Sequence, residues 1–161
     1  DKCVECSNPE ALFRKGTIEL FRKNEENAKN VGLQYIAKAA SKQHLLAVYV
    51  HGIVLISYGG SKRIEGIKIL SAIDDSDAIY YCRKTLRYKF CWRWWDAAIE
   101  IKDDGEKAKC SCQIKEKTLA WSGDYNTEVR ENYDDVCDFC KWDYEAKLFS
   151  NMIKTGHYYC S

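Results

Sequence analysis

The sequence has almost no excess charge of either sign, which limits the partners that it can attract. Its 25 lysines and arginines are balanced by 24 aspartates and glutamates, leaving a formal net charge of +1. A chain this close to neutrality has no overall field that would recruit nucleic acid or an anionic membrane. We therefore expect neither as a partner.

Long uncharged apolar runs are missing as well. The longest, from Leu45 to Tyr58, is shorter than the roughly 20 residues of a membrane-spanning helix and contains His51. We therefore predict no membrane-spanning segment. The sequence begins at Asp1 with neither a methionine nor an apolar leader, which favours a processed mature protein or an excised domain.

The sequence is also poor in histidine and lacks the common catalytic motifs. Its only histidines are His44, His51 and His157, and it has no phosphate-binding glycine loop, His-Glu-x-x-His helix or serine elbow. A cysteine with a histidine could form a nucleophilic pair, so such an activity stays an alternative. A histidine in an apolar helix is more often a core or groove residue, and we predict that the chain is not an enzyme.

What the sequence does contain is an internal repeat. The apolar stretch 44–60 has helical period. The pattern Ala-Leu-Phe-x-x-Gly at 11–16 returns as Ala-Val-Tyr-x-x-Gly at 47–52, an offset of 36 residues. The pattern at 32–36 returns at 66–70, an offset of 34. Helix pairs repeated at this period are typical of a helical solenoid.

The repeat divides the chain, whose 161 residues are enough for one domain with a real core, into three parts. Residues 1–8 form a cysteine-containing leading segment, and residues 9–73 form two helix pairs. Residues 74–161 add a further helix and a small cysteine-rich cap, packed on the repeats, that could include a β-hairpin built from 92–101 and 108–114. The prediction is a mainly α protein.

Two details of the repeats can be tested. The second helix is expected over about 30–42, after a polar connector at 23–29. Gly32 and Gly66 occupy equivalent positions in the second helix of each pair. Because glycine inside a helix costs about 1 kcal/mol relative to alanine, we expect a close backbone contact at both positions.

The stretch from Ala78 to Trp95 is basic and aromatic, with five basic residues, seven aromatic ones and no acid. This composition could suit a single-stranded nucleic acid or a glycan. Because the chain is nearly neutral, we favour an amphipathic helix whose aromatic rings enter the core while its arginines stay in solvent. If a ligand binds the helical groove or the tryptophan-rich stretch, its expected contacts are Tyr49, His51, Tyr88, Trp92, Trp94 and Trp95.

Nine cysteines form a second distinctive group, and four of them lie in two short motifs, Cys110-x-Cys112 and Cys137-x-x-Cys140. Four thiolates can hold one structural zinc, and the same four sulfurs can instead pair as disulfides. Nine cysteines exceed what one zinc explains, which favours disulfides slightly. No other cofactor is expected. Zinc or reduced thiols would indicate an intracellular protein, and disulfides a secreted one.

Several segments spread along the chain together match one known pattern: Asn8–Gly16, Gly32–Leu33, Lys38–Ala40, Ala47, Tyr49, Gly52, Gly60, Glu65–Gly66, Cys137–Glu145 and Leu148–Phe149. These segments resemble a family of plant F-box proteins whose region after the F-box is a tetratricopeptide-like domain of the short, Sel-one-like kind. The resemblance covers roughly half the chain and implies two tetratricopeptide-like helix pairs at 9–73. The chain shows no F-box segment, so the resemblance implies the recognition half of such a protein.

These observations predict a non-catalytic binding module that resembles the substrate-recognition region of plant F-box proteins. Its expected partner is another protein, or a small ligand, held in the helical groove. The alternative is a secreted, disulfide-stapled plant protein with a defence, carbohydrate-binding or effector role. The oligomeric state is left open.

Overall fold

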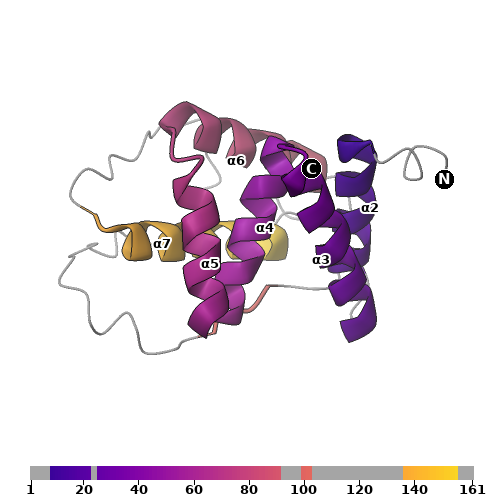
Figure 1. Cartoon of the computed structure of the whole chain (residues 1–161), viewed down its shortest axis with the longest axis horizontal. Coiled ribbons are helices and arrows are strands. Elements are labelled where there is room, and N and C mark those ends of the chain that lie inside the picture. Colours follow the sequence, from indigo (N-terminus) through magenta and orange to yellow (C-terminus); the bar gives the residue numbers. More distant parts are fainter. Residues whose placement is uncertain (1–7, 23–24, 92–98, 103–135, 156–161) are drawn as a thin grey trace.

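The computed structural model of the protein describes residues 8–22, 25–91, 99–102 and 136–155. Within these residues it contains six helices and no strand (Figure 1). None of the described helices is long and apolar enough to span a membrane. The helices are α2 (Pro9–Arg22), α3 (Glu26–Ser41), α4 (Leu45–Tyr58), α5 (Gly60–Ser71), α6 (Ser76–Cys91) and α7 (Asp138–Thr155).

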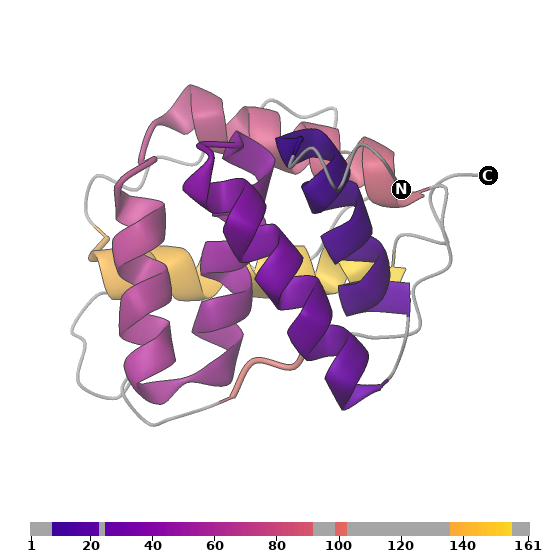
Figure 2. The same ribbon diagram turned by 45° about the vertical axis from the view of Figure 1, so that its right-hand side comes forward.

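The first four helices form two antiparallel pairs, α2 with α3 and α4 with α5, as the repeat predicts (Figure 2). The close backbone contact expected at the two equivalent glycines is confirmed. A Cβ atom added at Gly32 would lie 2.6 Å from the backbone nitrogen of Leu20 and 2.8 Å from the carbonyl oxygen of Gly16. A Cβ atom added at Gly66 would lie 2.5 Å from the carbonyl oxygen of Gly52. The glycines that recur in the sequence repeat therefore mark positions where two helices are in close backbone contact.

The link between α4 and α5 depends on glycine. Gly59 alone joins the two helices, with φ 73° and ψ −176°, and Gly60 opens α5 with φ 54°. The conformation of Gly59 is open essentially to glycine only, because a Cβ atom would collide with the backbone there. This single-residue link sets α5 directly beside α4.

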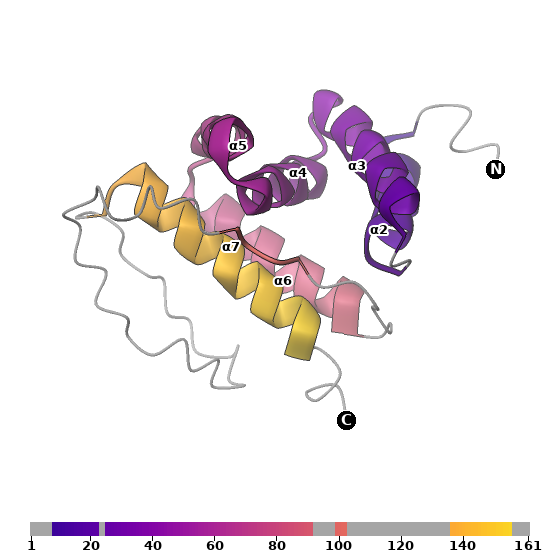
Figure 3. The same ribbon diagram turned by 90° about the horizontal axis from the view of Figure 1, so that it is seen from below.

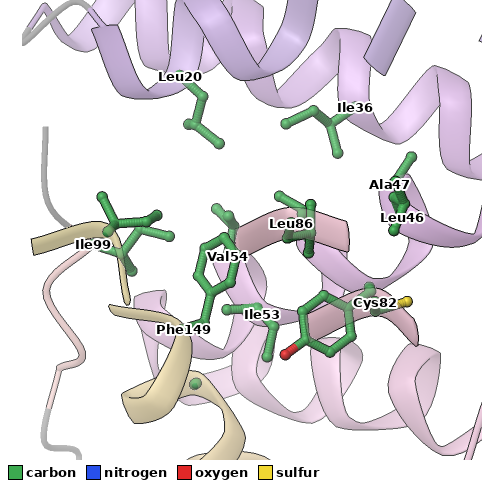
Figure 4. Close-up of a cluster of buried hydrophobic side chains, with 14 of the residues drawn as sticks. Leu20, Ile36, Leu46, Ala47, Ile53, Val54, Cys82, Leu86, Ile99 and Phe149 are labelled. Carbon is green, nitrogen blue, oxygen red and sulfur yellow. The ribbon is translucent and has the colours of Figure 1, made fainter. Parts of the chain in front are cut away.

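Helices α6 and α7 lie along one side of the two pairs (Figure 3). Both contact α4, and α7 also contacts α5. The ring of Phe21 on α2 meets Phe90 of α6 at 5.4 Å and Phe149 of α7 at 6.0 Å between centroids. Trp142 of α7 is fully buried. Figure 4 shows part of the resulting core, in which Leu20, Ile36, Leu46, Ala47, Ile53, Val54, Cys82, Leu86, Ile99 and Phe149 are labelled.

The strand expected over 92–101 does not form in the part that the structure describes. Residues 99–102 are irregular, and their backbone is held by helices rather than by a partner strand. The Ser150 hydroxyl donates a hydrogen bond to the Ile99 carbonyl at 2.6 Å, and the Lys102 amide donates to the Ser57 carbonyl at 3.1 Å. The remainder of the expected hairpin and cap, including 108–114, lies outside the described residues.

The orientation expected for the side chains of α6 is only partly correct. Phe90 is buried, but Tyr80, Tyr81 and Tyr88 are exposed, Tyr88 by 71%. Arg83, expected in solvent, instead has a side chain only 15% exposed that pairs with a carboxylate of α7. The buried carboxylate on α7 explains the burial of Arg83, because a buried negative charge must be paired with a positive one.

Candidate functional site

An open groove of about 770 Å³ lies where α3, α4 and α5 meet. Its α3 wall comes from positions 30, 33, 34 and 37, which share one helix face. We call it the outer groove, because the α4 residues that line it, His51, Leu55 and Tyr58, lie on the helix face opposite Tyr49, whose hydroxyl bonds to Glu145 of α7. Its lining residues are Asn30, Leu33, Gln34, Ala37, His51, Leu55, Tyr58, Lys62, Glu65 and Lys102.

The outer groove combines apolar side chains with polar groups that are still available. Leu55 is buried, and Leu33 and Ala37 are half-buried, so they supply its apolar surface. Asn30 and Gln34 are exposed one turn apart on α3, and their side chains make no hydrogen bond within the part of the chain that the structure describes. Apolar contact with a few convergent polar groups is the usual composition of a binding site.

Burial adjusts the titratable groups of the outer groove. It lowers the pKa of His51, an effect that the nearby Glu65 carboxylate partly opposes. Burial also raises the pKa of the Tyr58 hydroxyl, and the charge of Glu26 adds to this. At neutral pH the groove therefore presents a neutral imidazole and a neutral phenol beside its lysines. Such groups suit hydrogen bonding to a ligand.

The opposite side of α4 is closed by α7, which is fastened there by buried charges. Arg63 of α5 pairs with Asp143 of α7 at 3.3 Å, with both side chains below 8% exposed, and donates to the Lys102 carbonyl at 2.5 Å. Glu145 of α7 is 1% exposed and pairs with Arg83 of α6. Buried pairs of this kind hold a helix in one position, because breaking one leaves a charge without compensation. The inner side of the repeats is therefore occupied by the chain itself.

Comparison with known proteins identifies the family. The family model described as "Plant tetratrico peptide repeats" matches residues 1–91, more than half of the 161 residues. The chain belongs to this family of plant tetratricopeptide repeat proteins. Repeats of this type generally mediate interactions between proteins, so the chain is a protein-interaction module.

A curated relative agrees with this assignment. The Arabidopsis thaliana protein named "Putative F-box protein At1g67623" is 34% identical over 128 residues, which cover 74% of this chain and 42% of that protein. The chain thus spans less than half the length of this relative. No solved structure matches the chain.

In this tetratricopeptide repeat protein, only one of the expected ligand contacts that the structure describes lies in the outer groove. That residue is His51. Tyr49 is 1% exposed, on the inner side of α4, and its hydroxyl donates a hydrogen bond to Glu145. In this structure Tyr49 is therefore a core residue. Tyr88 is exposed on α6, away from the groove-lining residues. The structure thus does not bring these three residues together.

The remaining expected site residues stay predictions. Trp92, Trp94 and Trp95 lie outside the described residues, as do Cys110 and Cys112. Of the other two proposed zinc or disulfide cysteines, Cys137 is exposed just before α7 and Cys140 is buried in its first turn. Within the described ranges, no group of three or more metal-ligating side chains converges.

The groove residues that sequence reasoning missed carry a weak pattern. Asn30, Leu33, Gln34 and Ala37 stand at i, i+3, i+4 and i+7 of one helix. The stripe is half polar, so it does not register as a buried face. Lys102 had no such pattern, because it reaches the groove through a non-helical segment that docks on α4.

Proposed function

We propose that the protein is a non-catalytic recognition module that binds a polypeptide of a partner protein in the outer groove, as the substrate-recognition region of an F-box protein would. The observation that carries this proposal is the groove itself. It is open, partly apolar, and supplied with hydrogen-bonding side chains that the described chain does not use. Its volume, about 770 Å³, falls in the range of ordinary ligand sites, roughly 300–1,000 Å³.

The relation to F-box proteins supports the kind of partner. The curated relative bears an F-box name, and the present chain matches 42% of it. We propose that this shared region selects a protein for the activity that the rest of such a relative provides. The occupied inner side of α4 directs the partner to the outer groove.

A peptide-display experiment with two matched variants tests this function. Leu33→Glu places a charge in the outer groove, and Val31→Glu places the same charge on the same helix at a residue that is 42% exposed and outside the groove. We expect the unmodified protein to enrich peptides that Val31→Glu retains and Leu33→Glu binds at least about tenfold more weakly, since an apolar contact is replaced by a charge that binding must desolvate.

Melting temperatures must accompany this comparison, because Leu33 also touches the core. Gln34→Ala, at an exposed position, gives a second groove variant that leaves the core intact. The proposal fails if no peptide is enriched, or if both groove variants bind the enriched peptides as well as Val31→Glu does. The absence of catalysis is tested with hydrolase and transferase substrate panels. Turnover that disappears in His51→Asn would contradict it.

A further inference from the structure

One end of the outer groove gathers donors of hydrogen bonds. Because α3 and α4 are antiparallel about the turn at 42–44, Asn30 lies near the end of α4 at Tyr58. Lys102 reaches the same end, since its amide is bonded to the carbonyl of Ser57. The Asn30 amide, the Tyr58 hydroxyl and the Lys102 ammonium thus line one end of one groove.

These three groups are available to a ligand. The Asn30 amide, the Tyr58 hydroxyl and the Lys102 ammonium have no hydrogen-bond or ion-pair partner within the described chain. The Lys102 residue is exposed, while Tyr58 is half-buried. The carboxylate of an aspartate or glutamate side chain can accept hydrogen bonds from an amide, a phenol and an ammonium at once.

The charges along the outer groove favour an acidic ligand. It is lined by two lysines, Lys62 and Lys102, and by one acid, Glu65. Glu65 is already paired with Lys62 at 2.9 Å, so Lys102 carries the uncompensated charge. Glu26, in the first turn of α3, is an acid outside the groove lining whose charge adds to burial in raising the pKa of Tyr58. It makes no ion pair with Lys102.

The opposite end of the groove differs in character. On α3, Leu33 and Ala37 lie progressively farther from the donor end and supply an apolar surface. On α4, His51 is farther from that end than Leu55 is. An extended peptide rises about 3.3 Å per residue, so a short segment can place one side chain at Lys102 and another on Leu33 and Ala37. Gln34, one turn beyond Asn30 on α3, can bond the peptide backbone between these two side chains.

We propose, on the basis of the function above, that the outer groove recognises a linear peptide of a partner protein that carries an aspartate or glutamate beside an aliphatic residue. The acidic side chain binds Asn30, Tyr58 and Lys102. The aliphatic side chain packs on Leu33 and Ala37.

Charge reversal at Lys102 tests the proposal, and Lys68 supplies the matched control. Lys68 is an exposed lysine of α5 outside the groove lining, so Lys68→Glu changes the net charge of the chain equally. Peptides selected by the unmodified protein are sequenced, and one is labelled for fluorescence anisotropy. We expect enrichment of Asp or Glu, at least about tenfold weaker binding by Lys102→Glu, and unchanged binding by Lys68→Glu.

A charge swap completes the test. The same peptide with its acid replaced by lysine should bind Lys102→Glu better than it binds the unmodified protein. Added salt should weaken binding of the acidic peptide more than it weakens binding of a neutral analogue. Tyr58→Phe and Asn30→Ala should each weaken binding of the acidic peptide and leave binding of a neutral analogue unchanged.

The outcomes separate this inference from the proposed function. If selected peptides lack acids, or if Lys102→Glu binds them normally while Leu33→Glu does not, the acidic specificity is wrong and the groove remains the binding site. If Leu33→Glu also binds normally, the groove is not the site and both proposals fail. If sedimentation shows self-association that Lys102→Glu abolishes, the occupant is a second copy of the chain, which overturns the peptide proposal.

Discussion

Among single residues, Glu145 of α7 connects three helices, and no sequence pattern indicates this role. Its carboxylate, 1% exposed on α7, accepts from the Tyr49 hydroxyl of α4 and from Arg83 of α6, whose Nε lies 2.7 Å away. The guanidinium and carboxylate form a two-bond pair, the strongest neutralisation available to a buried acid. Three helices are therefore fixed to one another through one side chain.

We expect Glu145→Gln to destabilise the protein by about 3 kcal/mol or more, because it leaves the Arg83 charge half-buried without a partner. Tyr49→Phe should cost less, about 1.5–3 kcal/mol, because Glu145 keeps its pair with Arg83. Urea unfolding followed by circular dichroism gives both values. Glu65→Gln, which removes an exposed pair, is the control and should change stability little. Equal losses for Glu145→Gln and Tyr49→Phe would contradict the assignment.

Sequence reasoning placed Tyr49 in a binding site for a physical reason. Helix α4 is apolar on almost all sides, and ten of its residues are buried. Periodicity cannot distinguish two buried faces, so it could not tell the groove side, with His51, from the core side, with Tyr49. Arg83 and Glu145 stand 62 residues apart, and nothing local in either helix indicates the pairing.

For whole helices, the repeat was informative because close packing constrains residue type. Gly16 with Gly32, and Gly52 with Gly66, must be small for the backbones to meet, and this constraint is visible as a fixed offset. The start of α3 was misplaced for the opposite reason. The helix begins at Glu26, four residues before the expected start at 30, because its first turn is polar except for the buried Ala28 and therefore shows no apolar periodicity.

Gly66→Ala tests the packing of α4 on α5. The new Cβ would meet the Gly52 carbonyl oxygen at 2.5 Å and Ile56 Cγ1 at 2.9 Å, and a backbone oxygen can give way only if the helices separate. Overpacking costs about 1–3 kcal/mol or more, against a gain of about 1 kcal/mol in helix propensity. We expect a net loss of about 1–2 kcal/mol and a lower melting temperature.

The control for this change is Ser61→Ala, an exposed position in the same helix, which should be neutral or slightly stabilising. If Gly66→Ala proves as stable as Ser61→Ala, the helices are not in close backbone contact and the basis of the repeat is different.

In the whole molecule, the two repeat pairs and the two later helices close on each other through both apolar and charged contacts. Part of the apolar contact follows from the sequence, since Phe21 lies in the predicted helix pairs and Phe90 lies in the predicted amphipathic helix whose rings enter the core. The charged part does not, because Arg63 and Asp143 are 80 residues apart and each resembles a surface residue in its own helix. The position of α7, and therefore which side of α4 stays open to a ligand, could not be predicted from the sequence.

Acid titration tests another contact between distant helices, at Glu10. This carboxylate of α2 receives hydrogen bonds from Lys89 of α6 at 2.8 Å, from His44 before α4 at 2.9 Å and from Arg14 at 2.7 Å. Partial burial alone would raise the pKa of Glu10, but these bonds outweigh it and lower the pKa to about 2. Its folded pKa is thus below the ordinary value of 4.5, so its contribution to stability is complete above about pH 5 and disappears as the pH falls towards 2.

We therefore expect Glu10→Gln to be less stable than the unmodified protein at pH 7, with a difference that shrinks between about pH 5 and 2. Since the Glu10 side chain is 38% exposed, solvent screens these bonds and the difference at pH 7 should be about 1 kcal/mol. Urea unfolding at a series of pH values measures it, and other acids cancel in the comparison. Lys89→Met should reduce the same pH dependence and add little in the Glu10→Gln background. A difference that stays constant from pH 7 to 2 would show that Glu10 does not connect α2 to α6.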